Sequence, residues 1–251
     1  PDMNIPLVRS LDVQLAGRFE EYSDFGSVAK PKIALAWDIV DGLRLRASYS
    51  EGFRAPNLEQ VNATQYARLA GNTDYIRCEA DLRTGEITDF NACGRNASAS
   101  LLIAGNPDLE PEESTNQSVG LVFQPVFTPP SWGDFTFTVD HWRIEQEQIV
   151  GLLGAQTALA LDYLRRLQGS SNPNVNRDAP DADDIANFDG TDLEPVGDVV
   201  SINDQFVNLL PQTVEGVDFG VNWSNRTQWG RFNFSLNATK MLEYSREPGP
   251  I

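Results

Sequence analysis

The sequence contains few of the residues that most often carry catalysis or bind metal ions. Its 251 residues include two cysteines, Cys78 and Cys93, and a single histidine, His141. A structural zinc site needs about four Cys or His ligands, so such a site is disfavoured. No G-x-S-x-G motif and no glycine-rich phosphate loop occurs. These absences predict that the chain is not an enzyme and that it holds neither a metal ion nor a cofactor.

Basic residues and long apolar runs are also scarce. The chain has 19 Lys and Arg against 36 Asp and Glu, a formal net charge of -17. This charge repels phosphates and therefore argues against a nucleic-acid partner. No window approaches the roughly 18 apolar residues that a membrane helix needs. The first residues, PDMNIPLVRS, lack a basic start followed by an apolar core, so we expect a signal peptide to be absent or already removed.

The dominant pattern is the alternation of apolar and polar residues with a period of two, which is typical of β-strands. In the run LRLRASYS at residues 43–50, leucine, alanine and tyrosine alternate with arginine and serine. The same pattern recurs along the chain. It predicts seven strands, at residues 11–19, 33–39, 43–50, 119–123, 135–140, 217–223 and 232–239.

The connections between these strands favour one architecture over another. Alternation alone fits a soluble β-sandwich and a membrane barrel equally well. The predicted connections are residues 22–30, 41–42, 52–113, 125–133, 150–212 and 225–230. The third and fifth are very long, whereas loops beyond about 15 residues are uncommon in compact domains. Strands that run up and down place alternate connections on opposite sides, so both long loops share one side, as in outer-membrane barrels.

Several stretches resemble TonB-dependent outer-membrane receptors. The run RLRASYSEGFRAPNL, residues 44–58, ends a strand in the GFRAP signature of that family. The run GNPDLEPEESTNQSVGLVF, residues 105–123, is similar to its NP-x-L-x-PE-x-S motif before the next strand. VEGVDFGVNW at residues 214–223 resembles a later strand, and EYSDFGS at 21–27 resembles an earlier loop. These motifs occur in the order of the family.

The resemblance implies an outer-membrane barrel of about 22 strands with a plug domain in its lumen. It also implies that the TonB complex of the inner membrane supplies energy through a box ahead of the plug. Seven strands cannot close such a barrel, because open sheet edges are not tolerated in lipid. Residues 1–251 are therefore expected to be part of the barrel domain, with plug, TonB box and C-terminal strands lying outside the chain. The abrupt ends agree, since PGPI at 248–251 is not a terminal strand ending in an aromatic residue. The implied partners are TonB, a nutrient and membrane lipid.

Candidate substrate contacts lie at the start of the first long connection and within the second. In GFRAP, glycine permits an unusual turn and proline ends ladder pairing, so the motif is chiefly a structural joint. Arg54 and Asn57 are nevertheless candidates for contact with substrate. Residues 177–204 hold nine acidic residues and one basic residue. A solvated acidic loop is favoured over a Ca²⁺ site, because the glycine and terminal glutamate of an EF-hand are absent. The further candidates for substrate contact are Asp178, Asp181, Asp183 and Asp184.

Two further features of the long connections are predicted. Two cysteines in one loop of an exported protein favour a Cys78–Cys93 disulfide, with free thiols or a metal site as alternatives. The run AQTALALDYLRRLQ at 155–168, followed by a glycine, predicts a short helix packed on the barrel mouth. Its predicted apolar stripe consists of Ala160, Leu161, Leu164 and Leu167.

The sequence thus favours an all-β, antiparallel transmembrane barrel segment with long extracellular loops, located in the bacterial outer membrane. Its expected function is active import of a scarce nutrient, such as siderophore-bound iron, cobalamin or an oligosaccharide. The alternative is a secreted β-sandwich adhesin or carbohydrate-binding module. A module of that kind should purify without detergent, whereas a barrel should not.

Overall fold

The chain divides into two compact units. The computed structural model describes residues 11–22, 26–126 and 129–246. The sheet unit comprises Pro1–Ala55, Glu110–Ile149 and Leu210–Pro248. The loop unit is built from Pro56–Leu109 and Val150–Leu209, the two long connections of the sequence.

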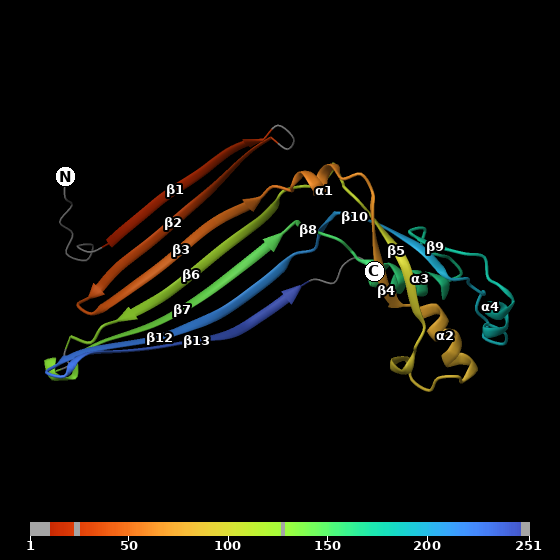
Figure 1. Ribbon diagram of the computed structural model, residues 1–251. Coiled ribbons are helices and arrows are strands. Elements are labelled where there is room, and N and C mark those ends of the chain that lie inside the picture. Colours follow the sequence, from red (N-terminus) through yellow and green to blue (C-terminus); the bar gives the residue numbers. More distant parts are fainter. Residues whose placement is uncertain (1–10, 23–25, 127–128, 247–251) are drawn as a thin grey trace. The chain divides into compact units, whose positions relative to one another are not determined.

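The sheet unit is one antiparallel meander of seven strands, and all seven predicted strands are confirmed (Figure 1). Most extend beyond their predicted ends. The sheet order is β1-β2-β3-β6-β7-β12-β13. The strands are β1 (Leu11–Tyr22), β2 (Gly26–Val40), β3 (Leu43–Arg54), β6 (Glu112–Phe123), β7 (Asp134–Glu147), β12 (Gln212–Thr227) and β13 (Gly230–Arg246).

The two faces of this sheet differ in chemistry, because side chains alternate along every strand. The apolar face is exposed: Leu15 keeps 72% of its surface accessible and Phe234 keeps 55%. One row across it runs Leu11, Trp37, Leu45, Leu121, Val139 and Phe219. A row on the opposite face runs Ala36, Arg46, Gly120, Asp140, Asp218 and Thr239.

The connections sort by length as predicted. At one end, β2 and β3 are joined by Asp41 and Gly42, and the positive φ of Gly42 (80°) suits glycine. At the same end, residues 124–133 join β6 to β7 through the 3₁₀ turn η2 (Pro130–Trp132), and residues 228–229 join β12 to β13. Both long connections leave from the other end. The prediction of a loop over 22–30 was too long, because β2 already begins at Gly26.

The two long connections fold together into the loop unit, which the sequence did not predict. Its sheet has the order β4-β5-β10-β9, and β5 pairs with β10 in parallel although they come from different connections. The strands are β4 (Tyr66–Thr73), β5 (Asn96–Ala104), β9 (Val175–Arg177) and β10 (Val199–Gln205). The short strands β8 (Ile149–Gly151) and β11 (Val207–Leu209) form a further pair.

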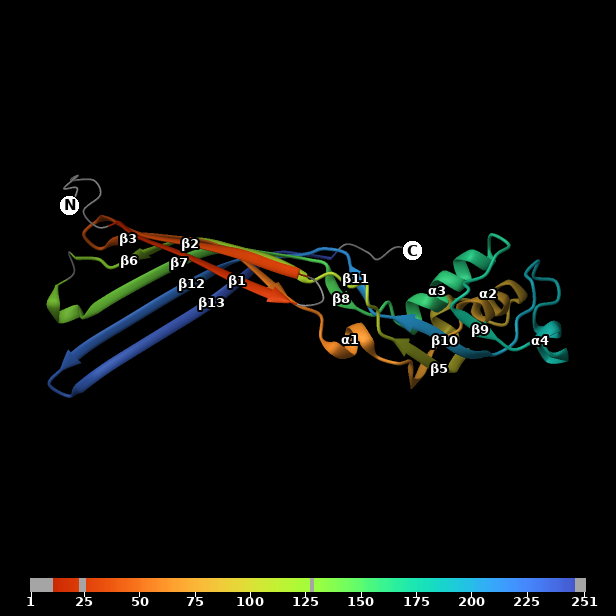
Figure 2. The ribbon, with the colours of Figure 1, turned by 90° about the horizontal axis from the view of Figure 1, so that it is seen from above.

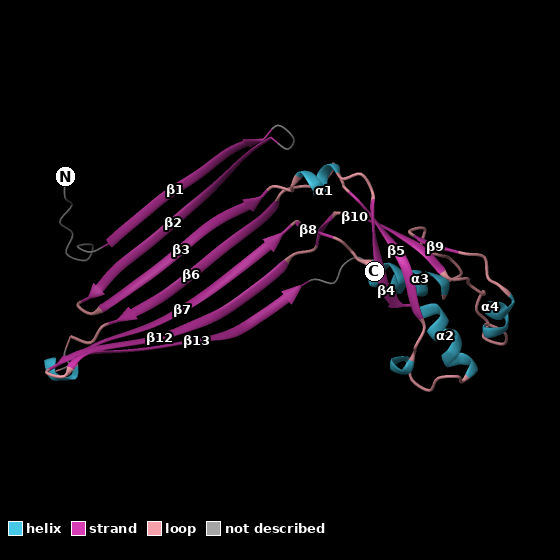
Figure 3. Ribbon diagram, viewed as in Figure 1, coloured by secondary structure: helices cyan, strands magenta, loops and turns pink. Residues whose placement is uncertain are grey.

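Apart from η2, the helices all belong to the long connections, whereas one helix was predicted (Figure 3). They are α1 (Leu58–Asn62), α2 (Tyr75–Thr84), η1 (Phe90–Ala92), α3 (Ala155–Arg166) and α4 (Ala182–Asn187). In Figure 2, α2 and α3 lie on one side of the small sheet. No helix of the described residues is long and apolar enough to cross a membrane.

The helix predicted at 155–168 is confirmed as α3, but its predicted apolar stripe was wrong. Leu164 and Leu167 are exposed, and the buried residues are Ala155, Leu159 and Asp162. These three residues recur with helical spacing, and α3 packs with them toward the small sheet. The resulting core contains Ala97, Ala99, Ala155, Leu159, Val175, Val199 and Ile202.

Candidate functional site

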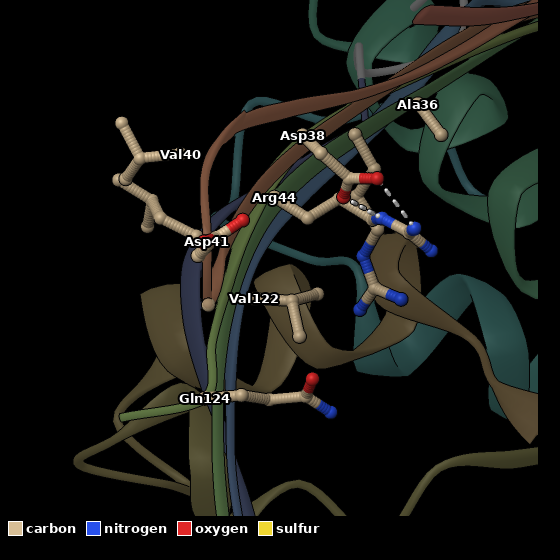
Figure 4. Close-up of a pocket in the computed structure, with 10 residues that line it drawn as sticks. Ala36, Asp38, Val40, Asp41, Arg44, Val122 and Gln124 are labelled. Carbon is tan, nitrogen blue, oxygen red and sulfur yellow. Dashed lines mark hydrogen bonds and ion pairs between the residues drawn. The ribbon is translucent and has the colours of Figure 1, made fainter. Parts of the chain in front are cut away.

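The polar face of the sheet unit carries arginines that are already neutralised. Arg44 donates two hydrogen bonds to Asp38, at 2.5 Å and 2.9 Å, inside a hollow beside the β2–β3 turn (Figure 4). Arg46 donates from Nε to Asp140 at 2.6 Å. Gly120 lies between Arg46 and Asp140 in the cross-strand row, and its missing side chain leaves room for this pair. These cations therefore already have anionic partners.

The GFRAP motif ends β3 as the sequence predicts. Arg54 is exposed and forms an ion pair with Glu112 across the β3–β6 ladder. The neighbouring Phe53 meets the edge of Tyr22 with ring centroids 5.9 Å apart, and the Arg18 guanidinium lies 5.4 Å from its centroid. Asn57 caps α1: its side chain accepts from the backbone N–H of Gln60 at 2.8 Å. The geometry gives Arg54 and Asn57 structural partners, and their contact with substrate stays a prediction.

The loop unit is held by buried charges that join its two connections. Arg177, with 5% of its side chain exposed, donates to both oxygens of Asp74, at 2.7 Å and 2.8 Å. It also donates to Asp162, which is fully buried, at 3.1 Å. Burial alone would lower the pKa of Arg177, but the hydrogen bonds and charges of Asp74 and Asp162 outweigh burial and raise that pKa. Arg77 of α2 adds ion pairs with Asp184 at 2.6 Å and Asp198 at 2.8 Å.

The four aspartates predicted to contact substrate lie around α4 and do not converge on one point. Asp181 is the N-cap of α4 and forms a reciprocal capping box with Asp184. Asp184 also pairs with Arg77. Asp183 lies in the first turn of α4 and is exposed, and Asp178 follows β9 and is exposed. Two of the four thus have structural partners, and substrate contact by any of them stays a prediction. Within the described part of the chain, no cluster of three His, Cys, Asp or Glu could hold a metal ion.

Cys78 of α2 and Cys93 form a disulfide with Cα atoms 5.6 Å apart. The bridge ties α2 to the segment that follows η1. Close by, Tyr75, Phe90 and Tyr163 pack ring against ring, with centroids about 6 Å apart. Tyr163 donates its hydroxyl to Glu79 at 3.0 Å, and burial together with this hydrogen bond raises the pKa of Tyr163.

A pocket that sequence reasoning missed lies in the loop unit, and we call it the carboxamide pocket. Asp204 belongs to it, and its carboxylate accepts from the backbone N–H groups of Gly154 and Gln205, both at 2.9 Å. Its full lining is Gln65, Ala104, Leu153, Asn174, Asn203, Asp204, Gln205 and Val207. Four of these residues, Gln65, Asn174, Asn203 and Gln205, carry side-chain amides. These amide groups make no hydrogen bond within the described residues. No motif could have revealed this pocket, because its residues come from both long connections and meet only when these fold together.

His141 lies on the apolar face of the sheet unit, in the row between Val119 and Val217. Its Nε2 is 2.8 Å from Glu215, and Arg143 donates to the other oxygen of the same carboxylate at 3.2 Å. This arrangement is an ion-paired cluster on the exposed apolar face of the sheet, rather than a nucleophile activated by a base.

Comparison with known proteins agrees with this geometry. The family described as "TonB dependent receptor-like, beta-barrel" matches residues 2–248. A probable TonB-dependent siderophore receptor, PirA of Acinetobacter baumannii, is 30% identical over 121 residues, which is 48% of this chain and 14% of that protein.

Two solved structures are similar in fold. The siderophore receptor PirA from Acinetobacter baumannii aligns with a TM-score of 0.54 and 18% identity, covering 93% of this chain and 26% of its own. The ferric enterobactin receptor PfeA from Pseudomonas aeruginosa aligns with a TM-score of 0.55 and 16% identity, covering 94% of this chain and 25% of its own. The chain therefore spans about a quarter of these structures. Because the family match covers nearly the whole sequence, the chain belongs to the TonB-dependent receptor-like β-barrel family of the outer membrane.

Proposed function

We propose that the receptor to which this chain belongs imports a ferric siderophore across the outer membrane, with energy delivered through TonB. The observation that carries the proposal is the family match over residues 2–248. The curated relative and the similar structures are siderophore receptors by name, which favours iron chelates over cobalamin or oligosaccharides. No enzymatic activity is proposed.

The sheet unit fits a barrel wall physically. Its exposed apolar face suits contact with lipid tails, and its polar face suits a lumen filled by protein or water. The loop unit joins the wall strands at the end opposite to the short turns. In outer-membrane barrels the longer loops are extracellular, so the loop unit would meet the substrate first.

Uptake of an iron-55-labelled siderophore by cells that express the full-length receptor tests the proposal. Accumulation at low external concentration should be lost when the receptor gene is deleted, when TonB is deleted and when a protonophore collapses the proton gradient. A passive pore behaves differently, because diffusion needs no energy. Uptake that persists in the TonB deletion would contradict energised import while leaving the barrel fold intact.

A further inference from the structure

The loop unit carries a strong excess of negative charge. Residues 56–109 and 150–209 contain 17 Asp and Glu but seven Arg and no Lys or His, a formal net charge of -10. Charge of one sign on a compact unit repels ligands of the same sign and lowers their encounter rate. The loop unit can therefore discriminate between substrates by their charge.

The arginines of the loop unit are largely occupied by its own carboxylates. Five of the seven form ion pairs: Arg77, Arg83, Arg95, Arg166 and Arg177. Within the described residues, Arg68 and Arg165 form none, and the Arg68 guanidinium lies 5.4 Å from the ring centroid of Tyr66. Ten carboxylates likewise have no basic partner in the described chain: Glu59, Asp89, Asp108, Asp178, Asp181, Asp183, Asp189, Asp192, Glu194 and Asp204.

The carboxamide pocket likewise contains a carboxylate and no cationic group. Four side-chain amides line it, from Gln65, Asn174, Asn203 and Gln205, and its single charged group is the carboxylate of Asp204. Amides donate and accept hydrogen bonds without carrying charge. Ala104, Leu153 and Val207 supply apolar surface. A pocket of this composition suits a neutral ligand rich in oxygen and amide groups, or a cationic one, and it contains no group that would neutralise an anion.

We infer that the loop unit selects a ferric siderophore whose iron complex is neutral or cationic, and that the carboxamide pocket contacts this complex. The inference rests on the proposed function and narrows its substrate class. Three hydroxamates cancel the charge of Fe³⁺, whereas three catecholates leave a trianion. The tris-hydroxamate class therefore fits the loop unit, and the tris-catecholate class does not. The fold similarity to a ferric enterobactin receptor is compatible with this, since at 16% identity it concerns the fold alone.

Isothermal titration of the purified full-length receptor with three iron complexes tests the inference. The probes are ferrioxamine B, which is a cationic tris-hydroxamate, its N-acetylated neutral derivative, and ferric enterobactin, which is trianionic. We expect both hydroxamates to bind at least about tenfold more tightly than the trianion at low salt. Added salt should narrow this gap, because it screens the repulsion.

Point variants distinguish the contribution of the carboxamide pocket to binding from that of the net charge of the loop unit. Asn203→Ala/Gln205→Ala should weaken both hydroxamates about tenfold, because each lost hydrogen bond removes part of the binding energy. Asp204→Asn keeps an acceptor oxygen for Gly154 but removes the charge, so it should weaken the cationic probe more than the neutral one. Gln168→Ala is the matched control, since this exposed amide lies outside the pocket and its loss should leave all affinities unchanged.

The possible failures are distinguishable. Equal or tighter binding of the trianion would overturn the charge selection while siderophore import stands, and loss of that binding in Arg68→Ala/Arg165→Ala would assign it to these two arginines. Unchanged hydroxamate affinity in Asn203→Ala/Gln205→Ala would overturn the role of the pocket. If the receptor neither binds nor imports an iron complex of any charge, the proposed function itself fails.

Discussion

At the residue scale, Arg177 holds the two long connections together through buried ion pairs. Its guanidinium joins Asp74 of the first connection to Asp162 of the second. The aspartates that follow this residue lack the spacing of an EF-hand, so the sequence predicts a solvated acidic loop, and it does not show where their basic partners lie. Arg77, which pairs with Asp184 and Asp198, lies more than 100 positions earlier. The number of acidic and basic residues can therefore be read from the sequence, but which of these charges form ion pairs cannot.

Replacing Arg177 by methionine should destabilise the loop unit by about 3–5 kcal/mol, because Asp74 and Asp162 would remain buried without a cation. Native-state proteolysis of the purified receptor measures this as faster cleavage within residues 56–109 and 150–209. Arg165→Met is the control, since Arg165 forms no ion pair in the described chain, and its effect should stay within about 0.5 kcal/mol. Equal protease resistance of both variants would contradict the role assigned to Arg177.

The Cys78–Cys93 bridge closes a segment with a sequence separation of 15, and such a loop is stabilised by roughly 3 kcal/mol in the chain-entropy model. Reduction of the native receptor should therefore accelerate cleavage between residues 79 and 92. Cleavage near Ser170, outside the bridged segment, should change less. Peptide mapping without reductant should recover the two cysteine peptides linked. Free alkylation of both thiols in the native protein would refute the bridge.

At the element scale, the long strands were predictable and the loop unit was not. The seven strands carry their own signal, because over a run of residues in each strand one face is apolar and the other is polar. The pairing of β5 with β10 has no such signal: both strands are short, and Ser100 meets Ser201 across about a hundred intervening residues. The stripe proposed for α3 failed for a related reason. Leucines occur on several sides of this helix, and the position of the small sheet decides that Leu159 is buried and Leu164 is not.

The packing of β12 against β7 depends on a missing side chain. A Cβ at Gly216 would lie 2.6 Å from the Trp142 ring and 3.1 Å from the Lys240 carbonyl oxygen. Gly216→Ala should therefore destabilise the sheet unit by about 1–3 kcal/mol through overpacking, seen as a lower heat-denaturation temperature of the folded barrel on gels. Gly17→Ala is the matched control in the same sheet, because a Cβ there meets no atom within 4 Å. If both variants denature at the same temperature, Trp142 moves aside freely and the space left by Gly216 does not limit the stability of the sheet.

At the scale of the whole molecule, the two units follow opposite rules of burial. The sheet unit exposes its large apolar side chains and pairs most of its charges on the other face, apart from the cluster of His141, Arg143 and Glu215, whereas the loop unit buries an apolar core as a water-soluble domain does. The first pattern fits a solvent of lipid and the second fits water. Composition averages the two units and conceals this difference. The alternation of the strands reveals the sheet unit, whereas the core of the loop unit has no comparable signal in the sequence.

This difference predicts which residues face the cell exterior. Residues 1–251 contain no free cysteine, because Cys78 and Cys93 are paired, so an introduced thiol is the only free one in this segment. In intact cells, Ser170→Cys in the loop unit should react with a membrane-impermeant maleimide. Asp41→Cys and Gln228→Cys, in the short turns, should react only after the outer membrane is permeabilised. All three positions are exposed in the structure, so differences in labelling report the side of the membrane rather than burial. Labelling of the short turns in intact cells, with Ser170→Cys protected, would reverse the orientation of the sheet and place the carboxamide pocket on the periplasmic side.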